Sequence, residues 1–171
     1  MAEYDAALDR WAESVPDPIR RDPLWRMRVY RLALFASDRG WTNVEALHGD
    51  RRTRAMADQL ARALGSVSAN IAEGYSRGSG RDRARFYEYA LGSAREARDW
   101  TYQGRHTIGT GQAERHVALL SEIVRQLLVI VQRQPGRRLR EPTADYDAHT
   151  PPPSGGATEP APNTQPAPRH S

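Results

Sequence analysis

Cysteine is absent from this chain of 171 residues. Without cysteine the protein can form neither a disulfide framework nor a thiolate metal site. Long apolar runs are absent as well, since the stretch 127–131 is far too short to span a bilayer. The first ten residues, MAEYDAALDR, are acidic and lack the apolar segment of a secretory signal. These absences predict a cytoplasmic protein without a membrane partner.

Lysine is also missing, so all 25 basic residues are arginine and the formal net charge is +4. A GC-rich coding bias is one explanation for this preference. Another is function, because the planar guanidinium group of arginine suits phosphate and RNA. The charge excess is small, so basicity alone does not identify a nucleic-acid partner.

Alternating apolar and polar residues, the pattern of strands, do not extend beyond a few positions. The sequence is patterned for helices and predicts an all-α protein. We divide it into an N-terminal extension (1–21), a four-helix bundle (22–134) and a proline-rich tail (135–171). The tail holds nine of the twelve prolines and few apolar residues. It cannot bury enough surface to offset its ordering entropy, so we expect it to be disordered.

The N-terminal extension is expected to form a short amphipathic helix with Leu8 and Trp11 on its apolar side. Asp22-Pro23 resembles an N-cap followed by proline at the first helical position, which predicts the start of the first bundle helix. The sequence Asp-Arg-Gly at 38–40 predicts a kink or fraying before the apolar pattern resumes.

The second bundle helix has the clearest pattern. Its apolar residues recur at steps of four, four, three and four, at Met56, Leu60, Leu64, Val67 and Ile71. A glycine follows at position 74, where a left-handed C-cap is expected to end the helix.

The third helix is expected to open with a capping box formed by Ser79 and Asp82. Thr110-Gly111 separates it from a fourth helix whose apolar positions end at Val131. Short connections favour antiparallel neighbours, so the predicted topology is an antiparallel up-down four-helix bundle. The apolar faces of the last two helices are broad, and we expect a second subunit to cover them.

Catalytic signatures are missing from the sequence. Glu45 and His48 have the spacing of one half of a di-iron site, but no second Glu-x-x-His pair exists. Zinc-protease, phosphate-loop and serine-hydrolase motifs are absent as well. We therefore expect no catalytic residue, no metal and no cofactor.

The stretch 65–77, GSVSANIAEGYSR, carries the most specific signal. Glu73 near a helix C-terminus opposes the macrodipole, so it should have a partner. Arg77, Arg81 and Arg85 are within plausible reach. Asn70 and Glu73 either lock the corner between the second and third helices by hydrogen bonds or contact a ligand.

Two spaced motifs resemble the "four helix bundle protein" family: Ser66-x-x-x-Asn70-Ile-Ala-Glu73-Gly74 followed by Arg77, and then Phe86-x-x-x-Ala90-x-Gly92-Ser93-x-x-Glu96. That family includes proteins encoded in intervening sequences of bacterial 23S ribosomal RNA genes. It is related to the accessory variability protein of diversity-generating retroelements. The resemblance implies a four-helix bundle that assembles as a homopentameric ring. From the corner argument above, we expect the motif residues to be structural. For the retroelement relatives it also implies a basic surface that binds RNA and a reverse transcriptase.

Arginines gather at both ends of the second predicted helix. The first arginine cluster is Arg51, Arg52 and Arg54, and the second arginine cluster is Arg77, Arg81, Arg83 and Arg85. They are either ordinary hydrated surface or phosphate-binding patches repeated by oligomer symmetry. Because they bracket one helix, they should lie at opposite ends of the bundle.

The sequence as a whole favours a non-catalytic oligomer that binds RNA or acts as a scaffold, with a reverse-transcriptase accessory factor as one form of that role. The alternative is a protein–protein adaptor ring that binds no nucleic acid.

Overall fold

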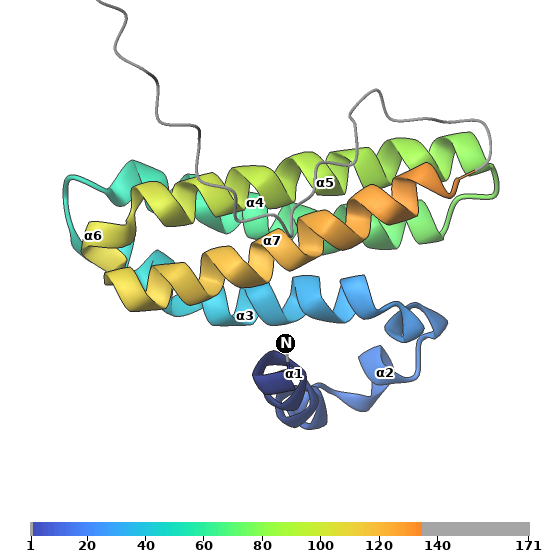
Figure 1. Cartoon of the computed structure of the whole chain (residues 1–171), viewed down its shortest axis with the longest axis horizontal. Helices are drawn as coiled ribbons and strands as arrows, with labels where there is room; N and C mark the ends of the chain where they lie inside the picture. The colour runs from blue at the N-terminus through green and yellow to red at the C-terminus, as the bar shows by residue number, and fades with distance from the viewer. Residues whose placement is uncertain (1, 135–171) are drawn as a thin grey trace, which may run out of the picture.

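Four long helices run along the length of the molecule in the computed structural model, which describes residues 2–134 (Figure 1). They are α3 (Arg28–Gly49), α4 (Arg54–Tyr75), α5 (Gly80–Gln103) and α7 (Thr110–Gln132). Helix α4 packs between α3 and α5, and α7 packs against both α5 and α3. The all-α class is confirmed, and residues 2–134 contain no strand. The tail that we predicted to be disordered, 135–171, lies outside the described residues.

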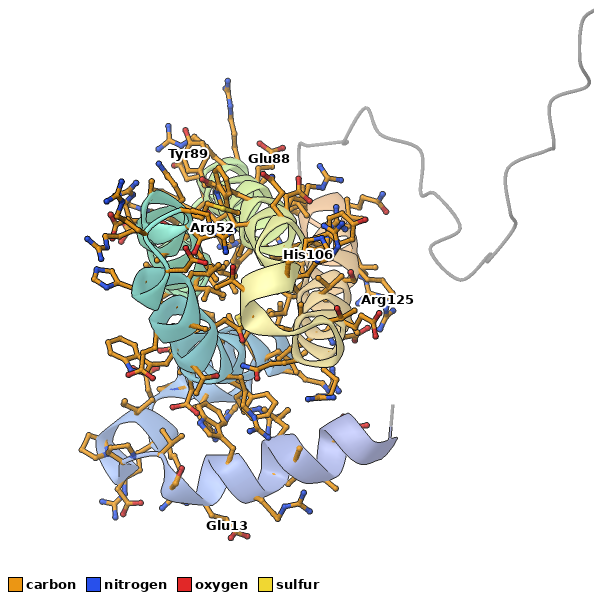
Figure 2. All side chains as sticks on the ribbon, turned by 90° about the vertical axis from the view of Figure 1, so that its left-hand side faces the viewer. Glu13, Arg52, Glu88, Tyr89, His106 and Arg125 are labelled. Carbon is orange, nitrogen blue, oxygen red and sulfur yellow. The ribbon has the colours of Figure 1, made fainter. Side chains whose placement is uncertain are left out.

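Shorter elements precede the long helices or lie between them. They are α1 (Ala2–Ser14), α2 (Asp17–Arg20), the 3₁₀ turn η1 (Pro23–Arg26) and α6 (Arg105–Ile108). Helix α1 lies across the outside of α3 (Figures 1 and 2). Its Leu8 is only 3% exposed, and the ring of Trp11 lies 5.3 Å from the ring of Phe35 on α3. The predicted short amphipathic helix is therefore confirmed.

The core lies between the four long helices, each of which contributes fully buried side chains such as Leu32, Leu60, Ala94 and Leu120. Most apolar residues of α7 from Leu119 to Val131 are buried in the core or packed against it within this chain, and Val129 is half-buried. Less apolar surface of α7 is therefore left over than the sequence suggested, and its cover by a second subunit stays a prediction. No described helix is both long enough and apolar enough to cross a membrane.

The start of the first bundle helix differs from the prediction. Asp22 does act as a cap, since its Oδ1 accepts a hydrogen bond from the Leu24 amide at 2.8 Å. It caps the 3₁₀ turn η1, however, and Met27 then has an extended backbone (ψ 110°), so α3 begins only at Arg28. Helix α3 also continues through residues 38–40 without the fraying that we considered there.

Two glycines that we expected to break helices instead allow helices to approach closely. A Cβ on Gly40 would lie 2.4 Å from Leu64 Cδ1, and one on Gly74 would lie 2.8 Å from the ring of Tyr87. Gly74 lies inside α4 and has no positive φ, so it is not the predicted left-handed C-cap. The positive φ in the described residues belongs to Gly109 (97°), between α6 and α7.

Candidate nucleic-acid interface

The two arginine clusters lie at opposite ends of the bundle. Helix α4 separates them with 22 residues, which corresponds to about 33 Å of helix. Figure 2 looks at the end that carries Arg52. The second cluster lies at the far end, where the Arg83 side chain reaches Gln134 beyond the end of α7.

The first cluster is partly neutralised by an acidic neighbour. Arg52 donates to Asp50 through Nη2 at 2.7 Å, and these hydrogen bonds lower the pKa of Asp50 to about 2. Arg54 donates to the neutral carbonyl of His48 at 3.4 Å. Among the described residues Arg51 forms no ion pair and is exposed. Arg51 and Arg54 therefore retain an uncancelled charge.

The arginines of the second cluster are also only partly neutralised. Arg83 donates only to neutral groups, namely Gln134 Oε1 (3.1 Å) and the carbonyls of Arg77 (3.1 Å) and Gly78 (3.2 Å). Arg81 is exposed and has no ion-pair partner within residues 5–134. Ser79 Oγ accepts from the Asp82 amide at 3.1 Å and donates to its carboxylate at 2.7 Å. The predicted N-cap is confirmed. It fixes the first turn of α5, and Arg81 belongs to that turn.

Aromatic rings accompany the second cluster. The family motif contained Phe86, but sequence reasoning predicted neither its contact with the arginines nor the role of Tyr89. The guanidinium carbons of Arg77 and Arg85 lie 4.8 Å and 5.3 Å from the centre of the Phe86 ring. Phe86 makes an edge-to-face contact with Tyr89, whose ring centre is 5.9 Å away. Tyr89 is 53% exposed and points away from the bundle on the outer side of α5 (Figure 2). The i, i+3 spacing of these rings was the signal that could have found them.

Most of the family-motif residues lie in two rows beside this aromatic pair. Residues 66, 70 and 73 of α4 are spaced by four and three, and Arg77 follows four positions later, just past the end of α4. Residues 82, 86, 89 and 93 of α5 are spaced by four, three and four, with 96 and 100 continuing that row. Such spacing places each row on one face of its helix. The rows meet where Arg77 lies over Phe86. We call these two rows the α4/α5 edge.

The motif side chains form local rather than cross-helix hydrogen bonds. Glu73 pairs with Arg77, one of the partners that we predicted for it. Asn70 Nδ2 donates to the Ser66 carbonyl at 2.8 Å, within its own helix, so it does not form the expected lock between two helices. Glu96 Oε1 accepts from Trp100 Nε1 at 3.3 Å. Gly92 is exposed and Ser93 is half-buried, both in α5.

A buried polar network between α3 and α7 is a second feature that the sequence did not reveal. His116 is 5% exposed, and its Nε2 donates to the Ala36 carbonyl at 3.0 Å. Its Nδ1 accepts from Asn43 Nδ2 at 2.7 Å, and Asn43 Oδ1 accepts from Gln112 Nε2 at 2.5 Å. Burial lowers the pKa of His116 to about 4, although the hydrogen bond to Ala36 opposes this shift. The imidazole is therefore neutral at pH 7.

An open cavity of about 590 Å³ lies beside this network, where α1 approaches α3 and α7. Its lining includes Asp38, Arg39, Asn43, Gln112 and His116. The carboxylates and histidines of residues 5–134 nowhere form a group of three or more that could hold a metal ion. The expected Glu45–His48 pair is exposed and is not part of such a group.

These features define the class of the protein as an all-helical bundle with arginine-rich ends and a polar, aromatic edge. The family of 23S rRNA-intervening sequence proteins matches residues 26–129, and the chain belongs to that family. A crystal structure of a protein of unknown function from the S23 ribosomal protein family of Bacteroides thetaiotaomicron is similar in fold and sequence. The two share 25% identity with a TM-score of 0.57, over 61% of this chain and 98% of that one. No curated protein matches the chain.

Proposed function

We propose that this protein is a non-catalytic, self-associating scaffold of the cytoplasm that binds RNA through its two arginine clusters. The observation that carries the proposal is that several guanidinium groups at the bundle ends keep their charge. Arg54 and Arg83 are bound by neutral acceptors, which orient a guanidinium without cancelling it. Phosphate groups bind such charges and release counterions as they do so.

RNA is the favoured polymer because the family is named for an intervening sequence of 23S rRNA. The resemblance to retroelement accessory proteins makes association with a reverse transcriptase one form of this role. Symmetry strengthens the electrostatic argument, since each added subunit brings a further net charge of +4.

Self-association is supported by two glycines on the outer faces of α4 and α5. A Cβ at Gly65 or Gly92 would meet nothing within 4 Å, so packing inside the chain does not require glycine there. Glycine inside a helix costs about 1 kcal/mol relative to alanine. Close approach of a second copy at these faces would account for this cost, and a homopentameric ring is the assembly we propose.

The competing function, a protein–protein adaptor, is favoured by exposed aromatic side chains. Trp41 on α3 is 66% exposed, and aromatic residues of this kind anchor many protein interfaces. An apolar anchor binds with little dependence on salt. Phosphate contacts weaken steeply between about 50 and 200 mM salt, which separates the two functions.

Native mass spectrometry of the untagged protein from cells, with and without ribonuclease, tests the proposal. We expect a multiple of the 19.2 kDa subunit mass with additional mass that ribonuclease removes. The same assembly without nucleic acid would favour the adaptor. A monomer would contradict self-association.

Arginine substitutions then locate the contacts. In the triple variant Arg51→Gln, Arg52→Gln, Arg54→Gln we expect the slope of log affinity against log salt to fall by about one for each lost phosphate contact. The control is Arg20→Gln with Arg21→Gln, because both of these arginines pair with Asp17 on the separate helix α2. An equal loss in the control would show that only total charge matters.

A further inference from the structure

The second arginine cluster differs from the first in the aromatic surface beside it. Phe86 packs under the guanidinium groups of Arg77 and Arg85 and supports the exposed ring of Tyr89. At the other end of the bundle, Arg51, Arg52 and Arg54 have no ring contact among the described residues, and the ring contact at that end is made by Arg105 with Tyr102. This difference bears on which form of a nucleic acid each end can bind.

The charge at the second cluster is modest, because Glu73, Asp82 and Glu88 lie among its four arginines along residues 73–89. Phosphate contacts alone would therefore bind weakly there. Base stacking on an aromatic ring adds about 1–3 kcal/mol per base, and it adds this only when the face of the base is accessible. In a double helix the base faces are stacked on each other, so a duplex presents only its backbone and grooves.

We propose that the Arg77–Arg85–Phe86–Tyr89 cluster is a stacking platform for an unpaired polynucleotide strand. The proposal rests on the nucleic-acid-binding function above and specifies the strand form that this end of the bundle takes. A base stacks on the exposed face of Tyr89, and the adjacent phosphates contact Arg85 and Arg81. The Phe86 ring holds Arg77 and Arg85 in place, which reduces the entropy that each arginine loses on binding phosphate.

The exposed pair between Arg77 and Glu73 does not block this role. Exposed ion pairs contribute little free energy, so a phosphate can compete for the guanidinium edge. The α4/α5 edge continues from the platform past Ser93 and Asn70. Asn70 Oδ1 has no hydrogen-bond donor recorded among the described residues, and so it remains available to a polar group of the strand.

The test measures the binding of labelled probes by fluorescence anisotropy for the full chain at about 50 mM salt. The probes are an oligouridylate, an RNA duplex of the same length and an oligothymidylate. We expect the oligouridylate to bind more tightly than the duplex. Tyr89→Ala should lower the affinity for the oligouridylate by about tenfold, as expected for the loss of one stacked base. Duplex affinity should stay within about twofold, and Tyr89→Phe should bind like the wild type because it keeps the ring.

Tyr102→Ala is the matched control. Tyr102 is 58% exposed and also lies under an arginine, with the Arg105 guanidinium 4.3 Å from its ring centre, but it lies at the opposite end of α5. Its substitution should leave the oligouridylate affinity unchanged. Comparing the two single-stranded probes shows the source of the strand, since weaker binding of oligothymidylate would identify RNA.

Two outcomes overturn different claims. If Tyr89→Ala and the wild type bind the oligouridylate equally, the stacking platform is wrong while RNA binding through arginine stands. If no probe binds the wild type, the proposed function itself is wrong. Because Tyr89 is exposed, the alanine variant should fold, and equal circular-dichroism melting curves would verify this.

Discussion

The α4/α5 edge and the α3/α7 contact use polar side chains in opposite ways. At the α3/α7 contact Asn43 and His116 are almost fully buried and each is hydrogen-bonded across the helices. At the α4/α5 edge Asn70 bonds within α4, and Glu73 pairs with Arg77 just past the end of that helix. All three side chains are half-buried or exposed.

This difference separates groups that stabilise the fold from groups that remain available to a partner. A buried polar group must keep its hydrogen bond, because losing it exposes the full cost of desolvation. An exposed polar group exchanges its partner for water, or for a ligand, at little cost. The contrast predicts large stability effects at the α3/α7 contact and binding effects with little loss of stability at the α4/α5 edge.

The largest effect is expected for Asn43→Ala. The substitution leaves His116 Nδ1 and Gln112 Nε2 without their shared partner, and we expect a loss of about 2–4 kcal/mol in the free energy of unfolding. Urea denaturation at pH 7 measures it. Glu45→Ala is the control, because Glu45 also accepts a side-chain hydrogen bond on α3, from Trp41, but is exposed. A loss as large in the control would remove the distinction between the two regions.

The next effect is a dependence of stability on pH that comes from His116. The pKa of His116 is about 4 in the folded protein and about 6.5 when the chain is unfolded, so the unfolded state binds more protons between these values. The stabilisation is fully present above about pH 6.5 and is lost as the pH falls toward 4, by up to about 3 kcal/mol. A protonated Nδ1 would also face the Asn43 amide, which is itself a donor.

Urea titrations across this pH range check the prediction. His116→Gln should flatten the slope between about pH 6.5 and 4 even if it lowers stability throughout. His106→Gln should leave the slope unchanged, since His106 is exposed on α6 (Figure 2). Equal slopes in the wild type and in His116→Gln would contradict the buried neutral imidazole.

Local signals in the sequence predicted much of the fold. The apolar steps from Met56 to Ile71 located α4, and the Ser79–Asp82 spacing located the start of α5, because both depend on neighbours within one or two turns. The Asp22-Pro23 signal was also local, but Met27 adopts an extended backbone after the 3₁₀ turn and delays α3.

Features that depend on packing between distant segments were not predictable in the same way. Gly40 resembled a helix breaker, yet its lack of a side chain makes room for Leu64 and His116 from two other helices. Asn43 and His116 are 73 positions apart, and no spacing rule connects them. At the candidate site, the sequence identified the arginines, and Phe86 as a motif residue, but not Tyr89. The contact of Phe86 with Arg77, which follows the end of α4, appears only in the folded chain.

The smallest expected effects come from two glycines, Gly74 on the inner side of α4 and Gly92 on the outer side of α5. Gly74 faces inward, where an added Cβ would meet the rigid, buried ring of Tyr87 at 2.8 Å and Phe86 Cβ at 3.2 Å. Overpacking of this kind costs about 1–3 kcal/mol, which exceeds the gain of about 1 kcal/mol in helix propensity, so Gly74→Ala should destabilise the protein.

Gly92 faces open space, and Gly92→Ala should stabilise the isolated chain by up to about 1 kcal/mol. Urea denaturation at high dilution measures both changes, and size-exclusion chromatography of Gly92→Ala at high concentration reports on assembly. A stabilised chain that assembles less well would place Gly92 in a subunit interface, whereas a stabilised chain that assembles normally would remove the outer face of α5 from that interface.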